Sequence, residues 1–289
     1  MNGILLIDKP EGWTSHDVVA KLRGALKVRR IGHSGTLDPM ATGLLVVFVG
    51  RATRAMEFAE SDEKSYMAAL RLGTRTDTQD ITGTVLSQCE PNVSEDELEE
   101  CLSKFKGEQL QVPPMYSAIK IGGKKLYELA RAGKEISRPP REITIFELSR
   151  TKDEGAEKGL FIRCSKGTYI RTLCFDIGEA LGCGGCMAAL RRTAAGSFSL
   201  SGAHTLDEVL KAAEDGRASE LLIATHMLFE QHDIIKLSEK QESRIKNGGS
   251  FSYTGADGMY RAFSAGGEFL ALVKLESGIM STIKSFYDV

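Results

Sequence analysis

The sequence has no long hydrophobic run. Although 42% of its 289 residues are hydrophobic, no uninterrupted apolar stretch reaches the roughly 18 to 20 residues that cross a bilayer. Residues 1–8 also lack the basic region and the cleavage-site pattern of a secretory signal. We therefore expect a cytoplasmic protein with no membrane association.

Cysteine is sparse as well. The six cysteines form no dense framework, which suits a reducing compartment where thiols stay free. Cys183 and Cys186 have the spacing of a redox or zinc motif, but no second such pair and no nearby histidine pair accompanies them. We interpret them as two reduced thiols at a helix end, and we predict no metal site.

The net charge is only -2, which does not in itself indicate a nucleic-acid-binding protein. The charge is unevenly distributed, however. Residues 115–200 contain 15 Lys and Arg against 9 Asp and Glu, whereas residues 94–100 are strongly acidic. A local basic surface attracts phosphate even when the total charge is acidic, although an ordinary solvated face would have the same composition.

Hydrophobic periodicity predicts strands mixed with helices, without a regular βαβ repeat. We expect helices after Thr14 or Ser15 and after Thr205, and a third with a capping box formed by Ser94 and Glu97. Further helices are predicted over 125–132 and 169–181, and strands over 3–8, 44–49, 64–72, 143–145 and 160–164, with a loop over 29–43. This mixture favours an α+β fold with a mixed or antiparallel central sheet.

The composition of the chain changes near its end. From about Ile234, short apolar runs alternate with glycines, which is typical of a small β-rich unit with tight turns. We place a domain boundary near Gln231, so that residues 1–231 form a large domain and residues 232–289 a small one.

The most specific string for chemistry is residues 33–43, HSGTLDPMATG. Asp38 precedes a proline, which favours extended backbone, and the glycines of this segment permit close approach to a ligand. A carboxylate in such a loop can act as a nucleophile. On the residues alone, a plain Asp-Pro turn is the favoured alternative.

Several further motifs occur in order along the chain. They are residues 9–15 (KPEGWTS), 64–66 (KSY), 75–78 (RTDT), 114–120 (PMYSAIK), 166–171 (KGTYIR) and 190–192 (LRR). Together with residues 33–43 they resemble the TruB family, tRNA pseudouridine-55 synthase, from the start of the chain to about residue 200. The glycine-rich tail resembles the PUA-type RNA-binding module that follows in that family. So many ordered motifs are far more specific than one short string.

The resemblance implies catalytic roles for three residues. Asp38 is then the nucleophile, Arg171 pairs with it and favours its charged form, and Tyr66 stacks on the uracil and takes part in the final proton transfer. Tyr169 and Leu190 would line the nucleotide pocket. Without the family, Arg171 would be interpreted as a helix-surface residue. Tyr66, Tyr169 and Leu190 would be interpreted as core residues.

The resemblance also implies residues that contact the RNA. His33 would enter the T loop and displace the target base, and Asp80 matches a position that contacts the RNA. Lys9, Lys120 and Lys166 are candidates for phosphate contacts, with an ordinary solvated surface as the alternative.

The implied activity is isomerisation of uridine to pseudouridine in the T loop of tRNA, on a flipped-out base. It balances without a cofactor, and no obligatory protein partner is expected. Alternatives are a synthase that works inside a guide-RNA particle and shares the Gly-Thr-Leu-Asp-Pro motif, a non-catalytic RNA-binding or RNA-folding protein, and a hydrolase that releases free uracil. Attack of Asp38 at C1′ of the sugar or at C6 of the base stays open.

Overall fold

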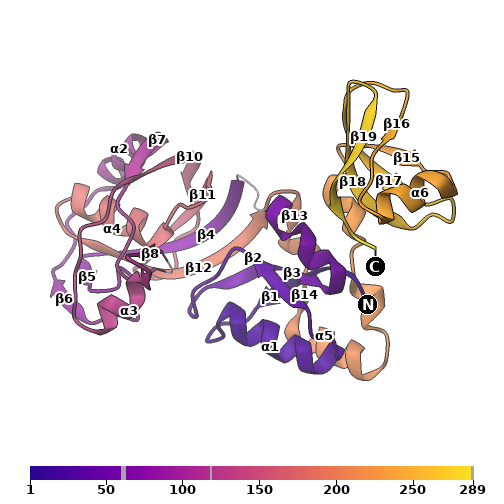
Figure 1. Cartoon of the computed structure of the whole chain (residues 1–289). Coiled ribbons are helices and arrows are strands. Elements are labelled where there is room, and N and C mark those ends of the chain that lie inside the picture. Colours follow the sequence, from indigo (N-terminus) through magenta and orange to yellow (C-terminus); the bar gives the residue numbers. More distant parts are fainter. Residues whose placement is uncertain (60–62, 118, 288–289) are drawn as a thin grey trace.

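The computed structural model describes residues 1–289 except 60–62, 118 and 288–289. In this part of the chain, ten strands form one long sheet with the order β14-β1-β3-β12-β4-β11-β10-β7, and β2 and β13 pair with β3 and β12 (Figure 1). The strands of this sheet are β1 (Gly3–Lys9), β2 (Ile31–Ser34), β3 (Thr42–Val49), β4 (Glu63–Leu72), β7 (Gly107–Gln111), β10 (Arg141–Arg150), β11 (Lys158–Ser165), β12 (Gly185–Ala195), β13 (Phe198–Ser199) and β14 (His204–Thr205).

The sheet is mixed. Most neighbours are antiparallel, but β1 runs parallel to β14, and β12 runs parallel to β3 where Arg191 and Arg192 pair with Thr42 and Gly43. The parallel β3–β12 junction joins the two halves of the sheet. It also brings the end of the 33–43 string beside the LRR motif. The predicted α+β class with a mixed central sheet is confirmed.

Helices pack against this sheet or lie beside it. They are α1 (Ser15–Leu26), α2 (Glu95–Lys104), α3 (Leu126–Arg131), α4 (Ile170–Ala180) and α5 (Leu206–Glu214). A further helix, α6 (Glu239–Lys246), packs through Ile245 in a separate core near the end of the chain. Alternate residues of β1 point to opposite faces, so Leu5 and Ile7 pack with Val18 and Leu22 of α1, whereas Ile4 and Leu6 pack on the other face. Another core lies between α2, α4 and strands β4, β10 and β11. Two short hairpins complete this unit: β5 (Thr74–Thr76) with β6 (Val85–Gln88), and β8 (Lys120–Ile121) with β9 (Lys124–Lys125).

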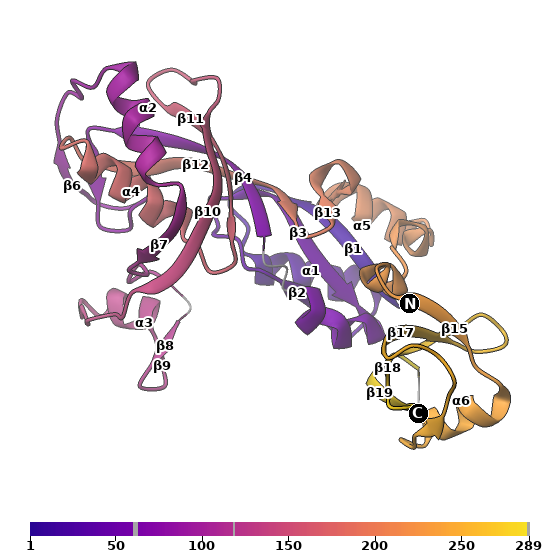
Figure 2. The ribbon, with the colours of Figure 1, turned by 90° about the horizontal axis from the view of Figure 1, so that it is seen from above.

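A second sheet lies at one end of the molecule (Figures 1 and 2). Its order is β15-β17-β18-β19-β16, formed by β15 (Asp233–Lys236), β16 (Phe251–Ser252), β17 (Gly258–Phe263), β18 (Phe269–Glu276) and β19 (Ile279–Ser285). Phe229, Phe269 and Phe286 pack together against the first unit. Arg54 adds hydrogen bonds to backbone oxygens of Ser285 and Tyr287. The β-rich end is therefore docked on the large unit by aromatic and polar contacts.

The predicted starts of helices were most accurate where a capping residue precedes the helix. Thr14, Ser94 and Thr205 each form a capping box at the start of α1, α2 and α5. The predicted loop over 29–43 was wrong in one part, because residues Ile31–Ser34 form strand β2 along β3. Among the described residues, no helix is long and apolar enough to cross a membrane.

Candidate active site

One cavity of about 760 Å³ gathers most of the predicted site residues. Its walls come from the loop between β2 and β3, from β4, from the loop after β5, from the start of α4 and from β12. The predicted residues that line it are Asp38, Tyr66, Asp80, Tyr169, Arg171 and Leu190. These positions lie up to 152 residues apart in the sequence, so only the fold brings them together.

The segment that precedes α1 holds the Asp38 loop in place. The buried hydroxyl of Ser15 accepts a hydrogen bond from the Leu37 N–H at 2.9 Å and donates to the Leu37 carbonyl at 3.2 Å. The Gly12 N–H donates to the Pro39 carbonyl at 2.8 Å. The residues on both sides of Asp38, Leu37 and Pro39, are thus fixed by their backbone groups, which explains why the KPEGWTS and GTLDP strings occur in one protein.

Lys9 also braces this loop, and its position corrects the predicted phosphate contact. Its side chain is fully buried, and its ammonium donates to the carbonyls of Pro10, Trp13 and Pro39 at 2.9, 2.7 and 3.3 Å. Three converging carbonyls satisfy all three donors of an ammonium. Burial lowers the pKa of Lys9 to about 8. Lys9 therefore has no free donor and no exposed surface for a phosphate.

Arg171 bridges two carboxylates. Its Nε lies 3.0 Å from Oδ2 of Asp38, and its Nη1 lies 3.4 Å from Oδ2 of Asp80. The same guanidinium donates to the carbonyl of Tyr116 at 2.8 Å and to that of Thr78 at 3.3 Å. Arg171 is 7% exposed, whereas Asp38 is 37% exposed. The planar arginine is fixed by the protein, and Asp38 is the partner that a ligand in the cavity can reach.

The pKa of Asp38 is raised above its ordinary value. Burial is the largest cause, because it penalises the charged carboxylate, and the negative charge of Asp80 adds to it. Arg171 and Lys9 act in the opposite direction. The predicted role of Arg171 in favouring the charged form therefore agrees in sign, but it does not outweigh burial.

Asp80 is buried, and its own oxygens are occupied. Oδ1 accepts hydrogen bonds from the hydroxyls of Thr78 and Thr82 and from the Thr82 N–H. Oδ2 faces Arg171. The RNA contact predicted for Asp80 stays a prediction. The geometry adds a different role, which is to hold the guanidinium that holds Asp38.

Tyr66 lies on β4 at the floor of the cavity and is 7% exposed. Burial raises the pKa of its phenol to about 12, so the phenol is neutral at neutral pH. Arg192 on β12 lies against Tyr66 and donates to the carbonyls of Leu44 and Gly35 at 2.7 and 2.9 Å. This buried arginine links the floor of the cavity to the start of the Asp38 loop.

Tyr169 stands at the N-terminus of α4, two residues before Arg171. Gln111 from the edge strand β7 clamps its backbone, since the side-chain amide accepts from the Tyr169 N–H at 2.8 Å and donates to the Tyr169 carbonyl at 3.0 Å. Leu190 lies on β12 and forms an apolar part of the wall. Both residues line the cavity, and their contact with a nucleotide stays a prediction.

His33 lies outside the lining of the cavity. It is half-buried in β2, two residues before Gly35, and its ring packs edge-on against His16 with 5.5 Å between centroids. Burial lowers its pKa to about 4, which makes the ring neutral at neutral pH. The predicted role in displacing a base stays a prediction for this residue, which lies two positions before the cavity wall at Gly35.

The two other candidate lysines lie in loops. Lys166 is exposed in the turn between β11 and α4, next to Gly167 and Thr168 of the cavity wall. Lys120 is the first residue of β8, and its side chain lies outside the described part of the structure. The cysteines of the 183–186 pair are free thiols, with Cys186 buried and Cys183 half-buried.

Sequence reasoning missed Ser15, Gln111 and Arg192. Ser15 was considered only as a helix cap, a role that Thr14 fills. All three side chains act on backbone groups, at separations of 22, 58 and 157 residues. No local pattern signals such contacts. Only the KPEGWTS and LRR strings, which contain Ser15 and Arg192, marked the segments as unusual.

The fold of nearly the whole chain is similar to that of chains in solved structures. A chain in the crystal structure of a Cbf5-Nop10-Gar1 complex superposes with a TM-score of 0.73 at 25% identity, covering 99% of this chain and 85% of that chain. A chain from a structure of an H/ACA RNP bound to a substrate RNA has a TM-score of 0.72 at 23% identity. This chain therefore shares the fold of those chains.

Sequence comparisons identify the family. Residues 23–170 match the family described as "TruB family pseudouridylate synthase (N terminal domain)". Residues 171–228 match the family described as "tRNA pseudouridylate synthase B C-terminal domain". The tRNA pseudouridine synthase B of Azoarcus sp. (strain BH72) is 43% identical over 96% of this chain and 92% of the relative. That of Alkaliphilus oremlandii (strain OhILAs) is 53% identical over 74% of this chain and 72% of the relative. The chain belongs to the TruB family.

Proposed function

We propose that this protein isomerises uridine to pseudouridine in the T loop of tRNA, with Asp38 as the nucleophile. One observation carries the proposal: the Asp38 carboxylate faces a cavity, on a loop braced from behind, with a buried arginine 3.0 Å from one oxygen. The relatives named tRNA pseudouridine synthase B support the choice of tRNA.

The reaction uses no external reactant. Asp38 attacks C1′ of the sugar or C6 of the base, and the bond between N1 and C1′ breaks. The uracil turns within the cavity, C5 bonds to C1′, and the proton on C5 leaves as N1 gains one. The carboxylate is released at the end, so atoms and charge balance over the cycle.

The cavity residues support these steps. Arg171 fixes the carboxylate in one orientation, which lowers the entropy cost of attack. The Tyr66 ring offers a face for the uracil, and base stacking on an aromatic ring contributes about 1 to 3 kcal/mol. Because its phenol is neutral, it is suited to relay a proton without adding a negative charge beside Asp38. Leu190 and Tyr169 exclude water.

Tritium release from tRNA that contains 5-tritiated uridine tests the proposal. The wild-type chain should release tritium and Asp38→Asn should not, while both bind tRNA equally. Release that is unaffected by the substitution would remove Asp38 as the nucleophile. Free uracil as the product would indicate a hydrolase.

An isolated T-arm stem-loop tests the guide-RNA alternative. The chain has no requirement for a protein partner under our proposal, so the purified protein should convert the stem-loop alone. Complete inactivity on both the stem-loop and tRNA, together with retained RNA binding, would favour a synthase that needs a guide-RNA particle or a protein that only binds RNA.

The proposal also gives the second sheet a role in binding RNA. We assign residues 232–289 as a PUA-like RNA-binding domain and residues 1–231 as the catalytic domain, with the boundary just before β15 at Asp233. A cytoplasmic location, where tRNA is available and the six free thiols stay reduced, completes the assignment.

A further inference from the structure

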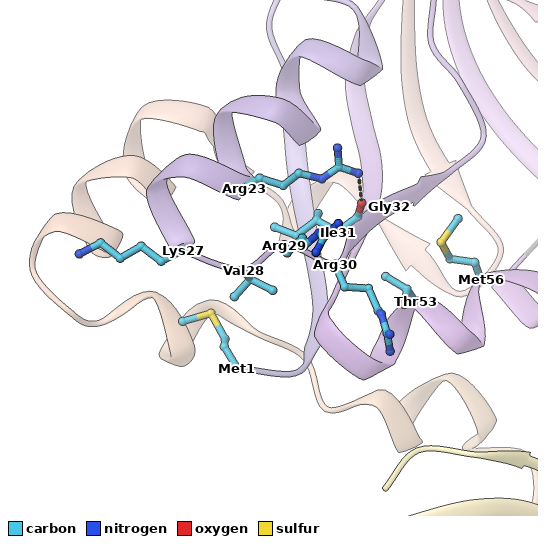
Figure 3. A pocket seen from close by; sticks show the side chains of 10 residues that line it. All are labelled: Met1, Arg23, Lys27, Val28, Arg29, Arg30, Ile31, Gly32, Thr53 and Met56. Carbon is cyan, nitrogen blue, oxygen red and sulfur yellow. Dashed lines mark hydrogen bonds between the residues drawn. The ribbon is translucent and has the colours of Figure 1, made fainter. Parts of the chain in front are cut away.

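A second hollow lies away from the catalytic cavity. It has a volume of about 830 Å³ and lies between the end of α1, the start of β2 and the 3₁₀ segment Gly50–Ala59. Figure 3 shows four cationic side chains around it, with Met1 and Val28 on one side and Thr53 and Met56 on the other. The cations are Arg23, Lys27, Arg29 and Arg30, and we call them the basic cluster.

The charge of this region is exceptional for the chain. Residues 21–56 contain seven Lys and Arg and a single acidic residue, Asp38, although the whole protein has a net charge of -2. All four side chains of the basic cluster are exposed. Arg23 donates to the Ile31 carbonyl at 2.7 Å. In the described part of the chain, no ion pair joins any of the four to a carboxylate, so their charges are available to an external anion.

Two elements connect the basic cluster to the catalytic loop. Strand β2 runs from Ile31 to Ser34, directly before Gly35 of the cavity wall. On α1, residues 16, 20, 23 and 27 have the spacing of one helix face and are all exposed. His16 on this face touches His33. At about 3.3 Å per strand residue, Arg30 and Arg29 lie within roughly 10 to 13 Å of His33 along the chain. At about 1.5 Å per helix residue, Arg23 and Lys27 lie roughly 10 to 16 Å from His16 along α1.

This distance matches the scale of a nucleic acid. Successive phosphates advance by about 3.4 Å along each strand of a helix, so the separation between the two histidines and the basic cluster spans roughly three to five base-pair steps. A polyanion whose target base occupies the cavity would have its backbone over the basic cluster a few nucleotides away. Arginine and lysine are the residues that neutralise phosphates at such distances from the base contacts.

We propose that the basic cluster is a second RNA contact, which binds the phosphate backbone of the same RNA a few nucleotides from the target uridine. The inference rests on the proposed function for the identity of the RNA. It assigns binding, not chemistry, to these residues. The contact adds affinity and salt dependence and leaves the catalytic step to the cavity.

The test uses the full chain with Arg29→Ala and Arg30→Ala combined. Its Kd for full-length tRNA should rise about tenfold, and the slope of log K against log salt concentration should decrease by about 1 to 2, because fewer counterions are released. The rate at saturating tRNA should equal that of the wild type. The charge-conserving variant with Arg29→Lys and Arg30→Lys should restore most of the affinity.

A matched control removes two exposed cations elsewhere. Lys104 and Lys106 lie at the end of α2, beside the acidic residues of that helix, and their joint replacement by alanine should leave the Kd unchanged. An unchanged Kd and salt slope in the Arg29 and Arg30 variant would overturn the proposal. The proposal would also be overturned if the variant lost binding to anionic lipid vesicles but kept wild-type binding to tRNA. Wild-type inactivity combined with a weakened Kd in the variant would refute the proposed function but support the contact.

Discussion

Replacing Ser15 by alanine is the sharpest test of how the catalytic loop is held. The Ser15 hydroxyl is 1% exposed and is hydrogen-bonded to both the N–H and the carbonyl of Leu37, the residue before Asp38. Leu37 itself is buried. Removing one oxygen atom therefore leaves two buried polar groups without these partners and frees the peptide that carries the nucleophile.

The structure gives the magnitude. A buried polar group that loses its partner costs about 1 to 3 kcal/mol, so two groups set an expected loss of about 2 to 4 kcal/mol after partial relaxation. That is smaller than the ordinary folding stability of about 5 to 15 kcal/mol, so the variant stays folded at 25 °C. A shift of about 1 Å in a reacting group can reduce the rate about 100-fold. We expect kcat to fall by about 10- to 100-fold with KM nearly unchanged.

Thermal unfolding and steady-state tritium release on the same preparation measure both effects. Ser94→Ala is the matched control, because Ser94 caps α2 through the same residue type and lies far from the cavity. Loss of a cap costs about 1 kcal/mol, and kcat should not change. A Ser15→Ala protein with lowered Tm and wild-type kcat would refute the idea that this contact orients Asp38. An unchanged Tm would show that the Leu37 groups find other partners.

Two further predictions concern the charges around Asp38. The acid limb of kcat/KM should lie above pH 3.8, because burial raises the Asp38 pKa, and Asp80→Asn should move it to lower pH by removing a like charge. If the acid limb lies at the same pH in the profiles of the wild type and Asp80→Asn, it belongs to another group such as His33, whose lowered pKa does not depend on Asp80. Arg171→Lys should lower kcat by about 10- to 100-fold, since one ammonium cannot replace a planar fork that reaches Asp38 and Asp80. Arg163→Lys, at an exposed pair with Glu63, is the control, and equal rates for the two variants would contradict the role of the fork.

Elements defined by local rules could be predicted from the sequence. The capping boxes at Thr14 and Ser94 use residues three positions apart, so the sequence contains the whole interaction. Strand β12 could not be found in this way, because the sequence GCMAALRRTAA is rich in alanine and favours a helix. It is a strand because β4 and β3 offer hydrogen bonds on both sides.

The same distinction applies to the site. That Asp38, Tyr66 and Arg171 share one cavity could be predicted because their motifs are specific to a family. The burial of Lys9 could not, since a lysine is almost never fully buried unless it is paired. Its three carbonyl partners come together only when the segments around Pro10, Trp13 and Pro39 meet.

The raised pKa of Asp38 explains why the loop needs so many braces. A carboxyl whose folded pKa exceeds its unfolded pKa stabilises the fold only when it is protonated, and that stability is lost as the pH rises through the folded pKa. Once it is ionised, Asp38 therefore works against the folded state, and the loop would relieve this by moving the carboxylate into water. Lys9, Gly12 and Ser15 hold the backbone on both sides of it, so this movement would break several buried hydrogen bonds. The braces keep a poorly solvated carboxylate at the cavity, where weak solvation makes it a better nucleophile.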